Sequence, residues 1–169
     1  YRTLFVDKGP GRRERLGKKD ERRDPVKKIT RTLNKSGMKA SQMHSGLNQE
    51  QRDKTIRNFK NKNIRILVAT DILSRGIDIK GIELVINYEV PHDAEDYIHR
   101  IGRTARAATE GEAVTFINEE DMYKFSRIEQ MMEQEVRKIQ PPADLGPGPE
   151  YNPKSRGSNP RGGRKPFRK

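Results

Sequence analysis

Residues 64–69 have the sequence Ile-Arg-Ile-Leu-Val-Ala, and the polar pair Thr70 and Asp71 follows at once. The run is apolar except for Arg65 and rich in β-branched side chains, which predicts a buried strand. Similar short apolar runs predict further strands over residues 2–6, 38–43, 84–87 and 113–117.

The segments between these runs carry helical signals. Asp24 and Pro25 fit the N-cap and first position of a helix that ends near Gly37. Asn48 fits the N-cap of a second helix, which extends to about Phe59. Two more helices are expected over residues 94–101 and 119–136, the longer one amphipathic. The alternation of strands and helices predicts an α/β fold with an open, mainly parallel sheet.

The net charge of +12 is concentrated near the two ends of the chain. Residues 25–150 carry 20 basic and 19 acidic residues. Residues 8–24 carry eight basic and four acidic residues, and residues 151–169 carry seven basic residues and no acidic one. Such flanks favour a nucleic acid as the partner. The alternative is a solvated tail without a specific partner.

The composition excludes several classes of protein. Because there is no cysteine, a disulfide framework and a thiolate metal site are excluded, and we expect a reducing compartment and a cytoplasmic protein. No apolar run approaches the roughly 20 residues that a membrane span needs, so no membrane association is expected. The chain begins at Tyr1 without Met and enters a strand-like run directly, so we interpret it as a fragment.

A first polar cluster, residues 70–79, follows the strand predicted from residues 64–69. It combines a hydroxyl, two carboxylates, an arginine and Gly76, and ligands of open α/β sheets bind at the carboxyl ends of strands. Gly76 permits close approach of a phosphate or sugar, and Asp78 could accept hydrogen bonds from a ribose hydroxyl. An ordinary turn capped by Asp71 is the alternative.

A second polar cluster, residues 99–106, contains arginines at every third position: Arg100, Arg103 and Arg106. On a helix these side chains would lie roughly along one side, and toward a helix end they could fan out. We expect the cluster to lie at a strand end as well. Guanidinium groups bind phosphates with two hydrogen bonds and stabilise the charge that develops in phosphoryl transfer. The alternative is a solvated basic helix end, favoured by the helix dipole.

Residues 11–19 superficially resemble a phosphate-binding loop. The spacing is wrong, because five residues rather than four separate Gly11 from Gly17. Lys19 also stands where the motif needs a hydroxyl for Mg²⁺. His44 and His92 are far from the second cluster in sequence, and no metal site is predicted.

Taken together, the two clusters resemble the DEAD-box family of RNA helicases. Residues 69–79 match the family's motif V, and residues 99–106 match its motif VI. Gln49 and Arg52 resemble part of its motif IVa. The resemblance is dense over residues 37–140 and implies a RecA-like fold and the C-terminal lobe of an ATP-dependent RNA helicase, an ATP hydrolase.

The resemblance implies a role in ATP binding for several residues. Arg103 and Arg106 would be arginine fingers that reach the γ-phosphate of ATP held by the other lobe. Gly76 and Asp78 would contact the nucleotide, Asp78 through the ribose. His99 would couple the ATP site to the facing lobe. The other lobe would hold Mg²⁺.

The same resemblance implies that RNA is bound through its backbone. Gly46, Gln49, Arg52, Thr70 and Arg75 would lie on the RNA side, and such contacts position a strand without reading its sequence. Closure of this lobe and the N-terminal lobe around ATP and RNA would bend one strand and open a short duplex.

Three departures from the family pattern matter. Ala105 stands where the family often has glycine, and residues 7–10 begin a charged run where motif IV normally continues into a helix. The N-terminal lobe, with its phosphate loop and Asp-Glu-Ala-Asp motif, is absent. We therefore expect this chain alone to be inactive toward ATP.

We predict a helicase domain over residues 1–142, with an atypical charged loop over residues 8–24, and a flexible basic tail over residues 143–169. Tyr151 and Phe167 in the tail could stack on RNA bases while its arginines follow the phosphates. Two other functions are open: a non-catalytic RNA-binding or annealing module, and a DNA-acting lobe of another superfamily 2 helicase.

Overall fold

The computed structural model describes the backbone of residues 3–8, and residues 25–70, 79, 82–91, 93–104 and 111–154 in full. The chain divides into two compact units, Tyr1–Phe116 and Ile117–Lys169. In chain order the first unit contains β1 (Thr3–Lys8), α1 (Pro25–Lys35), β2 (Ala40–Met43), α2 (Gln49–Lys60), β3 (Ile66–Thr70), β4 (Leu84–Asn87), α4 (Ala94–Ile101) and β5 (Glu112–Thr115). The second contains α5 (Met122–Met132) and the short 3-10 helix η2 (Ala143–Leu145).

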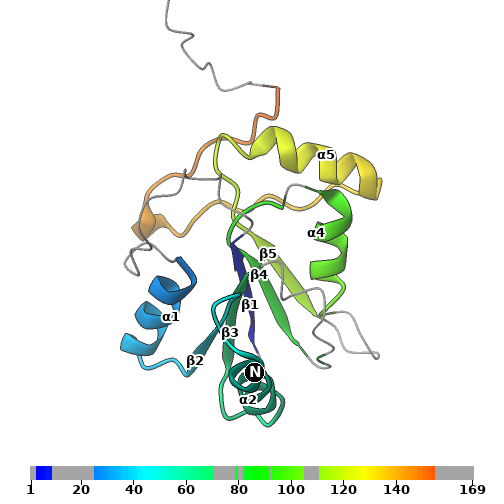
Figure 1. Ribbon diagram of the computed structural model, residues 1–169. Helices are drawn as coiled ribbons and strands as arrows, with labels where there is room; N and C mark the ends of the chain where they lie inside the picture. The colour runs from blue at the N-terminus through cyan, green and yellow to red at the C-terminus, as the bar shows by residue number, and fades with distance from the viewer. Residues whose placement is uncertain are drawn as a thin grey trace, which may run out of the picture. The chain divides into compact units, whose positions relative to one another are not determined.

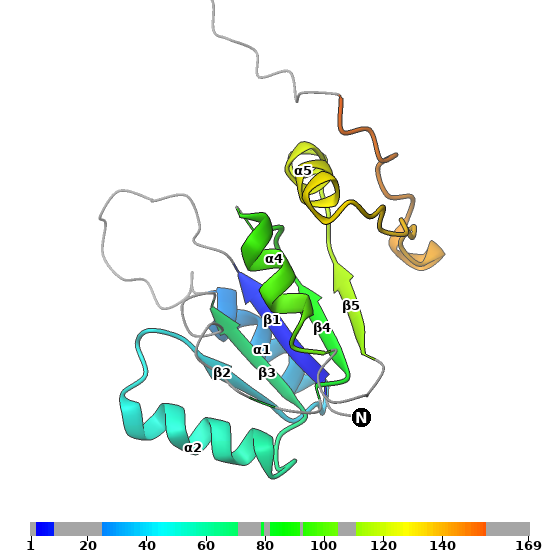
Figure 2. The same ribbon diagram turned by 90° about the vertical axis from the view of Figure 1, so that its right-hand side faces the viewer.

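All five strands form one parallel sheet in the order β2-β3-β1-β4-β5, visible in Figure 2. β1 is central, and its last residue, Lys8, pairs with Thr70 at the end of β3. The predicted α/β fold with an open, mainly parallel sheet is confirmed. The domain boundary predicted at residue 142 stays a prediction. The two compact units of the chain divide at another place, between Phe116 and Ile117.

Helices cover both faces of this sheet. In Figure 1 the sheet is seen nearly edge-on, with α1 on one face and α4 on the other. The hydrophobic core combines apolar side chains from α1 and α2, the strands and the segment before β4. Its buried members are Val26, Met43, Phe59, Leu67, Val68, Ala69, Ile79, Ile82 and Val85.

The predicted Pro25 start and Gly37 stop of α1 and the predicted Asn48 cap of α2 are confirmed, whereas Asp24, the predicted N-cap of α1, lies outside the described residues. α1 begins at Pro25, and Gly37 ends it in the left-handed region with φ of 77°. The N–H of Gly37 donates to the Asn34 carbonyl, and that of Met38 donates to the Leu33 carbonyl. Asn48 caps α2 with its side chain, as the sequence predicts.

The helix predicted over residues 119–136 is shorter in the structure. α5 covers Met122–Met132, and Glu133 adopts a left-handed conformation with φ of 51°. The physical reason lies one turn earlier, because Glu129 accepts the N–H of Val136 on its side-chain Oε1. That bond replaces the one to a helix carbonyl, so the helix does not continue to Val136.

In the described part of the chain, no helix is long and apolar enough to cross a membrane.

Candidate functional site

The carboxyl ends of β2 and β3 lie side by side because the two strands are parallel neighbours. Met43 pairs with Ala69, so the turn after β2 begins level with Thr70. Thr70 is half-buried and is the last residue of β3. This edge of the sheet therefore gathers Thr70 with the turn that contains Gly46.

The turn after β2 is built on His44. This side chain is buried, and its Nδ1 accepts the N–H of Gly46 at 3.1 Å. A Cβ on Gly46 would lie 3.1 Å from the same nitrogen, so a larger residue would push the ring aside. The imidazole and the glycine together fix the backbone of the turn. Nothing in the sequence indicated this structural role for His44.

The first turn of α2 adds the next two predicted residues. Arg52 donates from Nη2 to the Ser45 carbonyl at 3.2 Å, and Gln49 donates from Nε2 to Asp53. The Nε of Arg52 is buried and has no hydrogen-bond partner in the described structure. Since Arg52 bridges helix and turn, the structure brings Gly46, Gln49 and Arg52 together. The amino end of a helix with a guanidinium beside it suits a phosphate.

Four other predicted site residues lie outside the described part of the chain. These are Arg75, Gly76, Asp78 and Arg106. Their predicted roles stay predictions.

The second polar cluster follows α4, which matches its predicted bounds. His99 is exposed and lies in the last turn, whereas Arg100 is buried at 3% exposure. Gly102 follows the helix end, and Arg103 is half-buried in the turn after it. Of the two arrangements expected for the arginines, along one side of a helix or fanned out at its end, Arg100 and Arg103 adopt the second. The helix ends between them, and Arg100 faces inward.

The expectation that this cluster lies at a strand carboxyl end is wrong. β4 and β5 are parallel, so α4 must return the chain to the amino-terminal edge. Buried Thr104 lies against Gly111, directly before β5, where an added Cβ would meet its Oγ1 at 2.0 Å. Arg103 therefore lies toward the opposite edge of the sheet from Thr70.

An exposed aromatic pair at the carboxyl edge was missed by the sequence reasoning. Tyr88 follows β4 and Phe116 follows β5, and their rings meet edge to face with centroids 6.1 Å apart. Both are about half exposed, at 46% and 53%. The only available signal was an aromatic residue directly after each of two neighbouring strands.

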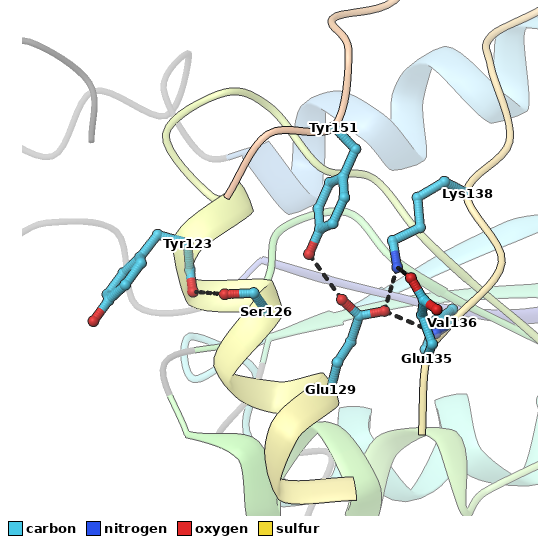
Figure 3. Close-up of polar contacts among 7 residues, drawn as sticks. All are labelled: Tyr123, Ser126, Glu129, Glu135, Val136, Lys138 and Tyr151. Carbon is cyan, nitrogen blue, oxygen red and sulfur yellow. Dashed lines mark hydrogen bonds and ion pairs between the residues drawn. The ribbon is translucent and has the colours of Figure 1, made fainter. Parts of the chain in front are cut away.

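A separate polar cluster belongs to the second unit and centres on Glu129 (Figure 3). Its carboxylate accepts hydrogen bonds from the Lys138 ammonium, the Val136 N–H and the Tyr151 hydroxyl. Burial alone would raise the pKa of Glu129, but these three donors outweigh it, so the pKa is lowered. Burial and the Glu129 carboxylate raise the pKa of Tyr151.

The flexible tail expected over residues 143–169 stays a prediction, and the part of it that the structure describes, residues 143–154, contacts α5 through this cluster. Tyr151 is tied to α5, with Lys138 Nζ 4.5 Å from its ring centroid, and Asn152 donates its N–H to Met122 Sδ. Stacking of Tyr151 on RNA bases stays a prediction, and one face of its ring is already in contact with Lys138. Phe167 lies outside the described residues.

Comparison with known proteins settles the family. Residues 19–108 match the family described as Helicase conserved C-terminal domain. The chain belongs to this family. It is 40% identical over 116 residues to the ATP-dependent RNA helicase DBP8 of Scheffersomyces stipitis, covering 69% of this chain and 26% of that relative.

Solved structures place this helicase domain in the DEAD-box branch. A DEAD box protein from the hyperthermophile Methanococcus jannaschii has a TM-score of 0.68 and 40% identity, covering 80% of this chain and 34% of that one. The S. cerevisiae protein Dbp5 bound to RNA and ADP BeF3 has a TM-score of 0.65 and 26% identity, with 78% and 32% covered. The helicase domain thus spans about a third or less of these relatives. The predicted DEAD-box C-terminal, RecA-like domain is confirmed.

Proposed function

We propose that this domain acts as the C-terminal lobe of an ATP-dependent RNA helicase. In this proposal it contacts the RNA backbone through Gly46, Gln49, Arg52 and Thr70. The observation that carries the proposal is the bridge from Arg52 to the Ser45 carbonyl, because it sets a guanidinium beside the amino end of α2 and the turn at Gly46. The relative DBP8 named above is an ATP-dependent RNA helicase, which supports the same ligand.

The proposed ATP contacts come from the other cluster. Arg103 and Arg106 supply positive charge to the γ-phosphate of ATP, and Gly76 and Asp78 contact the nucleotide. The N-terminal lobe holds ATP and Mg²⁺. Arg75 joins the RNA contacts and His99 links the two lobes. The resemblance of residues 69–79 and 99–106 to motifs V and VI supports these roles. A cytoplasmic location is proposed from the cysteine-free composition.

The placement of Arg103 away from Thr70 adds a feature to the proposal. The RNA contacts lie at the carboxyl ends of β2 and β3, while Arg103 follows α4 on its return toward the start of β5. RNA and nucleotide therefore approach this lobe at different places. The sheet, with α4 packed on one of its faces, connects the RNA contacts to the nucleotide contacts.

RNA binding by the chain itself tests the proposal. Fluorescence anisotropy with a labelled single-stranded RNA should give weaker binding for Arg52→Ala than for the unchanged chain, by about tenfold. The exposed Lys54, two residues further along α2, provides the control Lys54→Ala, which removes the same charge. Equal losses for both variants would indicate general attraction only. Stronger binding to the matching DNA than to RNA would favour a DNA-acting lobe.

A further inference from the structure

An open groove of about 630 Å³ lies between α1 and β2, away from the RNA site proposed above. β2 is an edge strand, since it pairs only with β3 in the described sheet. The groove is lined by basic side chains from α1, including Arg31 and Lys35, and by Ser41 and Gln42 from β2. We call it the α1–β2 groove.

The basic side chains form a row along one side of α1. Lys27, Arg31 and Lys35 are spaced by four residues, so successive members rise by about 6 Å along the helix axis. α1 has no acidic residue. Arg31 and Lys35 are exposed and form no ion pair in the described structure. Arg31 and Lys35 therefore present positive charge to the α1–β2 groove that no described acidic side chain neutralises.

The Asn34 side chain blocks the pairing of an added peptide strand with β2. Its side-chain amide donates to the Ala40 carbonyl at 2.9 Å and accepts the Ala40 N–H at 3.0 Å. These are the outward-facing peptide groups that an added peptide strand would use. Among the described residues that line it, the groove also has no aromatic or large apolar side chain to anchor a protein partner.

We propose that the α1–β2 groove is a second contact site for the RNA sugar-phosphate backbone. A row of cations beside hydroxyl and amide groups suits phosphates and ribose, which need no apolar anchor. β2 connects the two sites, because Gln42 lines the groove and Gly46 follows the strand. Four residues span at most about 14 Å, so one RNA strand a few nucleotides longer than the first site can reach both. This inference rests on the proposed RNA-binding function.

The test compares two double variants of the whole chain. Arg31→Gln with Lys35→Gln removes groove charges, and Lys28→Gln with Lys39→Gln removes the same charge at exposed residues that do not line the groove. Affinity for labelled oligouridylates of 4 and 20 nucleotides is measured by anisotropy across a salt titration. Equal thermal midpoints of all proteins show that the folds are intact.

We expect the groove variant to bind the 20-mer about tenfold more weakly at low salt. The magnitude of its salt slope should fall by roughly 1.4, the value for two single-strand phosphate contacts. The control should change both quantities by less than half as much. Binding of the 4-mer should be the same for the two double variants, because it occupies the first site alone.

Three results would overturn the inference. One is equal loss in the groove variant and its control, and another is an unchanged 20-mer slope in the groove variant. The third is binding of polyglutamate that depends on Arg31 and Lys35 while RNA binding does not, which would assign the groove to an acidic peptide. Arg52→Ala separates the two proposals: if it weakens RNA binding while the groove variant does not, only the groove assignment fails.

Discussion

Tyr151 donates its hydroxyl hydrogen to Oε2 of Glu129, with the two oxygens 2.8 Å apart and the two residues 22 positions apart in the chain. The same carboxylate binds Lys138 and the Val136 N–H, so one acidic side chain holds three points of the segment that follows α5. Asn152 continues this attachment through Met122. The basic segment beyond residue 154 therefore starts from a point that is fixed within the second unit.

Tyr151→Phe should loosen that attachment without removing the ring. Loss of a hydrogen bond to a charged carboxylate costs about 1.5–3 kcal/mol of stability, so the segment should open more often. Hydrogen exchange at the Asn152 N–H should become about tenfold faster or more. Tyr123→Phe is the matched control, because Tyr123 is exposed and its hydroxyl makes no hydrogen bond in the described structure. Unchanged exchange at Asn152 would contradict the role of Tyr151.

The stability that Glu129 provides should depend on pH in the acidic range. The folded pKa of Glu129 is lowered, so its contribution is complete above the ordinary glutamate value of about 4.3. The contribution is lost as the pH falls through the lowered folded value. The difference in unfolding free energy between the unchanged chain and Glu129→Gln should be constant above about pH 5 and shrink below about pH 4.

Urea denaturation at a series of pH values measures this difference. Glu120→Gln serves as the control because Glu120 is exposed and makes no ion pair in the described structure. A difference for Glu129→Gln that grows as the pH falls would have the wrong sign for a carboxylate stabilised by donors.

Gly111→Ala should destabilise the turn that carries Arg103. The added Cβ would lie 2.0 Å from Thr104 Oγ1 and 2.7 Å from the Thr104 carbonyl, so backbone must move. Overpacking of this kind costs about 1–3 kcal/mol. Gly102→Ala is the comparison, since its Cβ would lie 3.1 Å from the Ile98 carbonyl. Thermal unfolding should show the larger loss for Gly111→Ala, and equal midpoints would contradict the packing described.

Removal of residues 155–169 should weaken RNA binding and reduce its salt dependence. This segment contributes Arg156, Arg161, Arg164, Lys165, Arg168 and Lys169 and no acidic residue. Truncation after Lys154 keeps the Tyr151 attachment, which a cut at residue 146 would destroy. If the truncated and the unchanged chain have the same RNA affinity at every salt concentration, the basic end makes no contact with RNA.

Much of the fold could be predicted because its signals are local. The run before Thr70, the cap at Asn48 and the stop at Gly37 each act within a few residues, and the structure has them where the sequence places them. The end of α5 could not be predicted, since it depends on the Glu129 side chain capturing the Val136 N–H.

The site was predicted less completely, because its geometry depends on topology. Residues 99–106 were expected at the carboxyl end of a strand, but a helix between parallel strands must carry the chain back to the other edge of the sheet. The buried contact of His44 with Gly46 and the row of charges facing β2 likewise depend on which segments become neighbours. None of these has a signal within a few residues of sequence.

The central claim is that this lobe supplies arginine to ATP held by another lobe, and RNA-stimulated ATP hydrolysis tests it most directly. The measurement uses a two-lobed protein with this chain as its C-terminal lobe, comparing Arg103→Ala with Arg65→Ala, an exposed arginine before β3. Arg103→Ala should lower kcat by about 10³-fold or more, as loss of an arginine finger does, and Arg65→Ala should leave it unchanged. Near-normal turnover in Arg103→Ala, with RNA affinity retained, would contradict the claim.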